Sequence, residues 1–247
     1  MNGIVYVFHG SQKEEKNKAA MDFVQQLKNR LNEVALQEAA FLENHPWTIQ
    51  RQIEQLIEKG ADRIVIVPVL LFAARHALVD IPMETKKVQK KYPGIDIEQT
   101  ETFGDKEGSR QILLERFIQA RAECKIKDTA GVLLAHGTKR TEEPQKMLEE
   151  IAGELQEKTE LPVTAMSLKG QEDYIEQIYG LLQKYSQLII VPFFLFDGHL
   201  IHLLKERLTK EFPNHTFIIT PTLEFDHRIL DDLEKIVREA LYVPNND

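Results

Sequence analysis

Short apolar runs alternate with longer amphipathic stretches along the 247-residue chain. The runs are rich in β-branched residues, as is typical of buried parallel strands, whereas the longer stretches repeat apolar side chains at helical spacing. In the first half, this pattern predicts strands near residues 3–8, 35–42, 63–71 and 95–101. It predicts one helix that begins just after residue 9 and three more near residues 47–59, 81–91 and 106–122. We therefore expect an α/β fold made of four strand–helix units in this half.

The same order of segments then begins again. GVLLAHGTK at 131–139 echoes IVYVFHGSQ at 4–12, and LIIVPFFLF at 188–196 echoes IVIVPVLLF at 64–72. Such internal similarity predicts two tandem, related, flavodoxin-like domains, residues 1–123 and 129–247, joined by a linker at AECKIKD (122–128). Each is expected to be a small parallel sheet flanked by helices, with a cleft between the two domains.

Composition narrows the class of protein. Hydrophobic residues make up 43% of the chain and charged residues 28%, which is ordinary for a globular protein. The net charge of −8 and the lack of a basic stripe argue against nucleic-acid binding. The longest apolar run, 64–74, is too short to cross a bilayer, and no signal-type segment opens the chain, so we expect a cytoplasmic protein without membrane contact. With Cys124 the only cysteine, metal chemistry would use histidine and carboxylate ligands.

Three polar residues follow predicted strands of the first half. His9, Glu43 and His76 come directly or shortly after the strands near 3–8, 35–42 and 63–71. Ligands of open parallel sheets bind beyond the carboxyl ends of the strands, where these side chains would meet. Two imidazoles and one carboxylate suit a divalent first-row metal. Taken alone, each histidine is better explained by a structural role in a turn, and only the combination favours a metal site.

Structural roles also account for the neighbours of these residues. Ser11, followed three residues later by Glu14, has the signature of a capping box at a helix start. Asp80 has the position expected of a helix N-cap, with Pro82 in the first turn.

The second half repeats only part of this set. His136 and His199 match His9 and His76, but Lys169 stands where Glu43 stands in the first half. An ammonium group cannot ligate a metal and repels cations. The active site is therefore expected in the first half, with the second half supplying walls or substrate contacts. His199 and His202 could form an i,i+3 metal pair, although a surface or cleft-lining role is favoured.

The motifs together resemble a known family. HGS at 9–11, FLE at 41–43, the apolar strand with Pro68, and H-x-x-x-D-I-P at 76–82 are similar to those of the sirohydrochlorin chelatases, which are class II chelatases. The resemblance covers nearly the whole chain, including the fused double-domain arrangement of the long bacterial members. It implies insertion of Fe(II) or Co(II) into a tetrapyrrole without ATP, and no cofactor beyond the substrate metal. It also implies that His9, His76 and Glu43 are the catalytic and metal-binding residues. Lys169 departs from a duplicated site, and the chain lacks the His-rich tail and extra cysteines of some cobalt-inserting members.

The implied chemistry requires a base and a cationic rim. Metalation removes two protons from pyrrole nitrogens, and a neutral imidazole can accept a proton or hold a metal near neutral pH. Sirohydrochlorin carries eight carboxylates, so we expect positive potential from helix N-termini after Ser11 and Thr138. The side chains expected to contact the substrate are Ser11, Lys13, Arg75, Lys139 and Arg140.

Three alternatives to a ferrochelatase remain open. A sirohydrochlorin cobaltochelatase of an anaerobic cobalamin route would use the same ligands, because Fe(II) and Co(II) are adjacent in the affinity series. A carrier of metal or tetrapyrrole would bind without turnover. A phosphoryl-transfer enzyme with His9 as nucleophile ranks third, because Phe8 stands where an arginine could hold phosphate and no Walker-type loop is present. The duplication favours a monomer, since two halves within one chain could already enclose a site.

Overall fold

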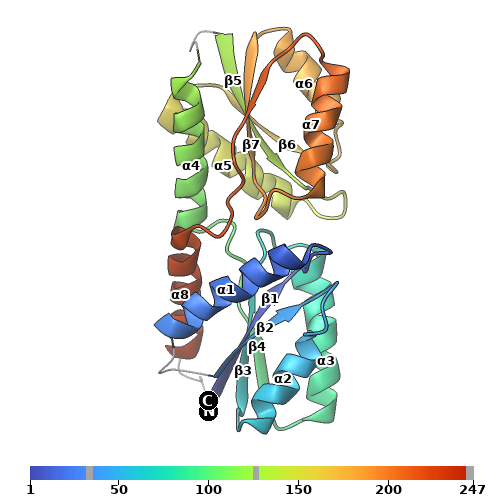
Figure 1. Cartoon of the computed structure of the whole chain (residues 1–247), viewed down its shortest axis with the longest axis vertical. Coiled ribbons are helices and arrows are strands. Elements are labelled where there is room, and N and C mark those ends of the chain that lie inside the picture. Colours follow the sequence, from blue (N-terminus) through green and yellow to red (C-terminus); the bar gives the residue numbers. More distant parts are fainter. Residues whose placement is uncertain (32–35, 125–127, 243–247) are drawn as a thin grey trace. The chain divides into compact units, whose positions relative to one another are not determined.

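Each half of the chain forms its own four-stranded parallel sheet, in the order β2-β1-β3-β4 and β6-β5-β7-β8 (Figure 1). The computed structural model describes residues 1–31, 36–124 and 128–242. The first sheet contains β1 (Asn2–Phe8), β2 (Leu36–Phe41), β3 (Arg63–Pro68) and β4 (Asp96–Gln99). The second contains β5 (Thr129–Ala135), β6 (Val163–Ser167), β7 (Gln187–Pro192) and β8 (Phe217–Ile219). The expected α/β class with two related parallel sheets is confirmed.

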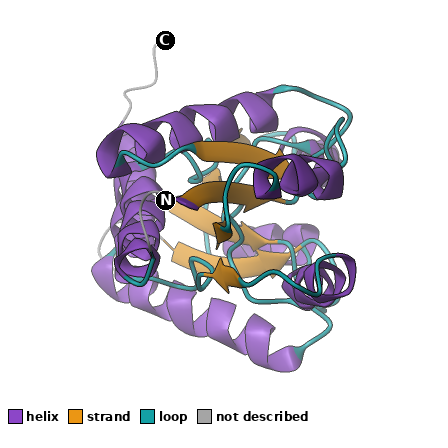
Figure 2. Ribbon diagram, turned by 90° about the horizontal axis from the view of Figure 1, so that it is seen from above, coloured by secondary structure: helices purple, strands orange, loops and turns teal. Residues whose placement is uncertain are grey.

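Helices cover both faces of these sheets (Figure 2). In chain order they are α1 (Glu14–Arg30), α2 (Ile49–Glu58), the π-helix η1 (His76–Asp80), α3 (Ile81–Lys91), α4 (Glu107–Ala122), α5 (Glu143–Thr159), α6 (Tyr174–Leu182), α7 (His199–Glu211) and α8 (His227–Tyr242). Every helix in the described part of the chain is too short or too polar to span a bilayer.

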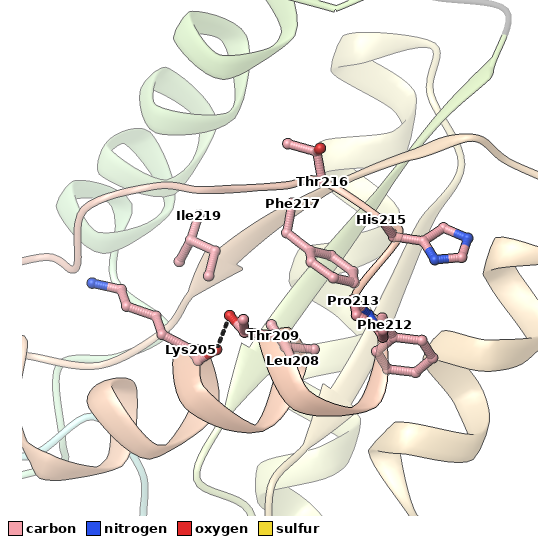
Figure 3. Close-up of a pocket in the computed structure, with 9 residues that line it drawn as sticks. All are labelled: Lys205, Leu208, Thr209, Phe212, Pro213, His215, Thr216, Phe217 and Ile219. Carbon is pink, nitrogen blue, oxygen red and sulfur yellow. Dashed lines mark hydrogen bonds between the residues drawn. The ribbon is translucent and has the colours of Figure 1, made fainter.

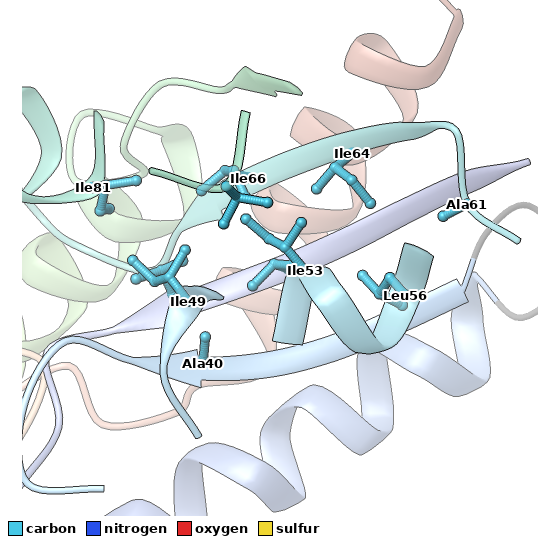
Figure 4. Packing of buried hydrophobic residues seen from close by; sticks show 11 residues of the cluster. Ala40, Ile49, Ile53, Leu56, Ala61, Ile64, Ile66 and Ile81 are labelled. Carbon is cyan, nitrogen blue, oxygen red and sulfur yellow. The ribbon is translucent and has the colours of Figure 1, made fainter. Parts of the chain in front are cut away.

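The central strands β1 and β3 are buried on both faces, which explains their continuous apolar sequences. On one face, alternate strand residues such as Val5 and Ile66 pack against the apolar stripe of α2. Figure 4 shows Ile49, Ile53 and Leu56 of that stripe over the strands. The second sheet has an equivalent core, to which α6 and α7 contribute. The apolar runs of the sequence thus serve to fix the strand ends that carry the polar residues.

The last helix of each sequence repeat packs in the other half of the chain. The structure divides into two compact units, one formed by Met1–Gly108 with α8 and the other by Ser109–Asp226. In the first unit α8 contacts α1 and β3, and Arg30 forms an ion pair of 2.6 Å with Asp231 (Figure 1). In the second unit, Phe117 of α4 lies directly over Gly131 of β5, where an added Cβ would come within 2.5 Å of the ring.

These units differ from the linear division at residues 1–123 and 129–247 that the sequence suggested. Sequence repeats and compact units do not coincide here, because α4 ends the first repeat but packs with β5, and α8 ends the second repeat but packs with α1 and β3. The expected linker at 122–128 lies partly outside the described residues, which omit 125–127.

Candidate functional site

The carboxyl edge of the first sheet carries His9 and Glu43 side by side. Backbone pairing between β1 and β2 continues beyond both strands, since Leu42 N donates to Phe8 O (3.0 Å) and Glu43 N donates to His9 O (2.9 Å). His9 and Glu43 are both exposed at this edge, as their positions in the sequence predicted. The sheet therefore fixes the spacing of the two backbones before any side chain contributes.

His76 meets His9 at the same edge. Residue 76 begins η1 after the loop that follows β3. The two imidazole rings lie with their centroids 4.6 Å apart and their planes at 88°, an edge-to-face arrangement. His76 is half-buried whereas His9 is exposed. The structure thus brings together two residues that are 67 positions apart in the sequence.

Both imidazoles offer the same free nitrogen. His9 Nδ1 lies 3.1 Å from Gly10 O, and His76 Nδ1 lies 2.8 Å from Asp80 Oδ2. A carbonyl oxygen or a carboxylate can only accept a hydrogen bond, so Nδ1 carries the proton in each ring. In neutral His9 and His76, Nε2 then has a lone pair for a metal ion or a proton.

Gly10 makes the approach of β1 and β2 possible. Its φ is +91°, and a Cβ at this position would lie 1.9 Å from Glu43 O, inside van der Waals contact. Only glycine fits this backbone.

We expect Gly10→Ala to destabilise the fold by more than the roughly 1–2 kcal/mol that a left-handed conformation costs, and to lower the metalation rate by displacing His9 from Glu43. Gly60→Ala is the matched control, since Gly60 has a φ of +93° but nothing within 4 Å of the added Cβ. Urea unfolding should show the smaller loss for Gly60→Ala and an unchanged rate per folded molecule. Equal losses in the two variants would contradict the tight approach at Gly10.

The start of α1 differs from the expected capping box. The helix begins at Glu14, and Ser11 lies before it, accepting a hydrogen bond from Lys13 N on Oγ at 3.1 Å. The buried side chain of Asn17 ties this loop down, because its Oδ1 accepts from Ser11 N and its Nδ2 donates to Ser11 O, both at 2.8 Å. The amides of Ser11 and Lys13 are therefore already paired within the chain.

Asp80 does not cap α3 as expected. It occupies the position before Ile81 but makes no capping hydrogen bond with its side chain. Its two oxygens instead contact His76 Nδ1 and, at 3.3 Å, Arg75 Nε. Sequence analysis missed this role, although a His and an Asp four positions apart are within side-chain reach on one helical face.

The backbone hydrogen bond from Glu43 N to His9 O places Glu43 at the same edge of the sheet as the two histidines. Within residues 1–31, 36–124 and 128–242, no group of three His, Cys, Asp or Glu side chains is arranged to hold a metal ion. The three-ligand set of His9, His76 and Glu43 therefore stays a prediction, of which the structure displays the histidine pair.

His45 fixes the loop that carries Glu43. Its ring lies 4.2 Å from that of Phe41 and 5.2 Å from that of Trp47, and its Nδ1 accepts a hydrogen bond from Trp47 N at 3.2 Å. Partial burial lowers the pKa of His45, which favours the neutral ring. This histidine thus has a structural task that sequence analysis did not assign.

The second unit repeats the backbone of the site with different side chains. Lys169 N donates to His136 O at 2.9 Å, the counterpart of the Glu43–His9 bond, which confirms that Lys169 occupies the position of Glu43. His136 Nδ1 lies 2.9 Å from Gly137 O, as His9 does from Gly10 O. His199 begins α7, while His202 is exposed and contacts Glu206 at 3.2 Å.

The remaining predicted contacts are distributed over both units. Lys13 and Arg75 belong to the first unit, whereas Lys139 and Arg140 belong to the second. Arg140 N donates to Thr138 Oγ1 at 3.2 Å, and α5 begins only at Glu143, so Thr138 does not open that helix as expected. A separate cavity of about 290 Å³ lies between α7 and β8, lined by Phe212 and His215 among others (Figure 3). Its lining from α7 starts at Lys205, so it does not include His199 at the beginning of that helix.

Comparison with known proteins places these features in a family. The CbiX family model matches twice, at residues 3–120 and 130–240. A sirohydrochlorin ferrochelatase of Priestia megaterium is 35% identical over 213 residues, which cover 84% of this chain and 78% of the relative. A sirohydrochlorin cobaltochelatase of the same organism is 28% identical, covering 83% and 68%. The structure of SirB from Bacillus subtilis with Fe3+ superposes with a TM-score of 0.83 at 27% identity, covering 98% of this chain and 96% of that one.

Proposed function

The chain belongs to the CbiX family and is a sirohydrochlorin chelatase, and we propose that Fe(II) is the metal it inserts, giving siroheme without ATP. The expected metal chelatase is thereby confirmed, and the alternatives of a non-catalytic carrier and a phosphoryl-transfer enzyme are set aside. We further propose that it acts as a monomer in the cytoplasm.

The proposed site rests on the observation that the side chains of His9 and His76 lie next to each other. Two neutral imidazoles, each with a free Nε2 and with centroids 4.6 Å apart, can hold a divalent metal at the moment when it leaves its water ligands. The same nitrogens can accept protons from the pyrrole nitrogens. Glu43, which is exposed at the end of the neighbouring strand, would orient an imidazole or accept a proton.

Apolar side chains beside His76 support binding of a flat macrocycle. Leu78, Val79 and Met83 are exposed by 57%, 47% and 52%, although such residues are usually buried. Because Val79 and Met83 follow His76 by three and seven positions, they lie near its face of the helical segment. The apolar ring faces of sirohydrochlorin would contact these side chains.

Cations would bind the carboxylates at the edge of the macrocycle. Lys13 is exposed at the start of α1, and 58% of the Arg75 side chain is exposed despite its contact with Asp80. We propose Lys13, Arg75, Lys139 and Arg140, with the hydroxyl of Ser11, as substrate contacts. Their positive charge would offset the net charge of −8.

The preference for iron rests on the relatives. The ferrochelatase is 35% identical and the cobaltochelatase 28% over the same number of residues, 213. The imidazole and carboxylate donors suit both metals. A sirohydrochlorin cobaltochelatase is therefore the second candidate.

The metal preference can be measured by the anaerobic change in the visible spectrum of sirohydrochlorin with Fe(II) or Co(II) at matched concentrations. We expect a larger kcat/KM for Fe(II) than for Co(II), after subtraction of the rates without protein. A kcat/KM for Co(II) that equals or exceeds the Fe(II) value would assign the chain to cobalt insertion.

A further inference from the structure

His76 and Asp80 form a side-chain pair at the two ends of η1. His76 Nδ1 lies 2.8 Å from Asp80 Oδ2, and both side chains are partly buried, with 35% and 23% exposed. Asp80 Oδ1 accepts from Arg75 Nε at 3.3 Å. Both carboxylate oxygens are therefore used within one turn, and neither caps α3.

The pair determines which nitrogen His76 presents. A carboxylate at Nδ1 holds the proton there, leaves Nε2 unprotonated in the neutral ring and limits rotation of the imidazole. Histidines that ligate metals commonly donate their second N–H to a carboxylate in this way, which also makes the free nitrogen more basic. His9 has only the carbonyl of Gly10 at its Nδ1, a neutral acceptor.

The second unit lacks this arrangement. His199 begins the α-helix α7 directly, without a π-helical turn, and the residue four positions later is Leu203, which is 43% exposed. The helical segment after His76 leads to KKYPGIDI (90–97), and the one after His199 leads to the similar KEFPNHTF (210–217). Seventeen positions separate His76 from Pro93, whereas fourteen separate His199 from Pro213. The longer segment of the first half begins with a π-helical turn, a feature that occurs frequently at functional sites. The carboxylate is thus present only beside the histidine whose half also has Glu43.

We propose that Asp80 is a positioning residue for metal insertion, holding His76 in the Nδ1–H tautomer with Nε2 directed to the reaction. The assignment of His76 to the reaction rests on the proposed function. Asp80 itself does not contact the metal or the macrocycle. Removing it would leave a ring that samples the other tautomer, in which Nε2 is protonated and cannot bind a metal or accept a proton.

The test uses Asp80→Ala and the isosteric Asp80→Asn, with Asp22→Asn as a control. Asp22 also forms an i,i+4 ion pair within one helical segment, at 3.0 Å from Lys18 Nζ, but lies on the exposed surface of α1. In the full-length chain labelled with ¹⁵N-histidine, two-bond ¹⁵N–¹H spectra at a pH where imidazoles are neutral report the tautomer of each ring. Wild type and Asp22→Asn should show His76 as Nδ1–H, and Asp80→Ala should show a majority of Nε2–H.

Metalation kinetics give the second measurement. We expect Asp80→Ala to lower kcat by roughly 10–100-fold with little change in the KM for sirohydrochlorin. Asp80→Asn can still accept from Nδ1–H without a charge, so its kcat should be intermediate; it remains informative if the alanine variant does not fold. An Nε2–H tautomer of His76 in wild type, or an unchanged kcat in both Asp80 variants, would overturn the proposal. The tautomer is measured without substrate, so a failure of wild type to metalate sirohydrochlorin would count against the proposed function and not against the pairing.

Discussion

His9→Ala and His76→Ala should each lower the kcat for metal insertion into sirohydrochlorin by roughly 100-fold or more, the usual contribution of a positioned acid–base group. Each substitution removes one of two adjacent imidazoles, whose centroids are 4.6 Å apart. The remaining histidine can hold a metal ion or accept a pyrrole proton, but it lacks its neighbour for the other task. Anaerobic visible spectra of sirohydrochlorin, recorded over time with Fe(II), measure the effect directly.

The second unit supplies matched controls for this experiment. His136→Ala and His199→Ala alter the equivalent strand-end histidines of the half in which Lys169 replaces Glu43. These variants should retain kcat within a few-fold of wild type. Circular dichroism would establish that all four variants fold. Losses as large in the control variants as in His9→Ala and His76→Ala would mean that the reaction does not belong to the first half.

A fragment of residues 1–123, the first sequence repeat, should fail to fold despite containing His9, Glu43 and His76. It lacks α8, which completes the first unit. Five buried residues of α8 would be lost: Ile229, Leu230, Leu233, Ile236 and Val237. At about 1.5–3 kcal/mol for each buried aliphatic side chain, their loss amounts to roughly 7–15 kcal/mol, comparable with the whole stability of a typical domain. Circular dichroism and urea unfolding would detect the loss.

A rearranged fragment provides the control. Residues 1–108 joined by a short Gly-Ser linker to 227–242 restore α8 and omit all but the first two residues of α4. The linker can be short, because Gly108 N lies 3.3 Å from Asp232 Oδ1 in the first turns of α8. This fragment should unfold cooperatively. Cooperative unfolding of 1–123 with equal stability would contradict the exchange of α4 and α8.

Much of the architecture follows from local pattern in the sequence. The apolar runs at β1 and β3 gave correct strands, because strands buried on both faces cannot tolerate polar residues. The sequence similarity between the halves predicted two related sheets. The predicted match of Lys169 with Glu43 is confirmed, because each donates an equivalent backbone hydrogen bond to the strand-end histidine of its half. The meeting of His9 and His76 also follows, since parallel strands deliver their carboxyl ends to one edge.

Other features depend on information that a local pattern does not contain. The stripes of α4 and α8 predict helices but do not specify which of two similar sheets each one covers. The H-x-x-x-D spacing at residues 76–80 is compatible with a capping aspartate as well as a side-chain pair, and only the π-helical turn decides. Asn17, within a helix, gave no sign in the sequence that it would bind the backbone of Ser11. Each of these outcomes depends on tertiary contacts or on a small change in helical geometry.

The most direct measurement is the X-ray absorption spectrum of Fe(II) bound anaerobically to the full chain and to its His9→Ala and His76→Ala variants. The central claim is that these two imidazoles hold the metal during insertion. It predicts two imidazole ligands in the wild-type spectrum and one in each variant. A wild-type spectrum without imidazole scattering, or one that neither substitution changes, would contradict the claim.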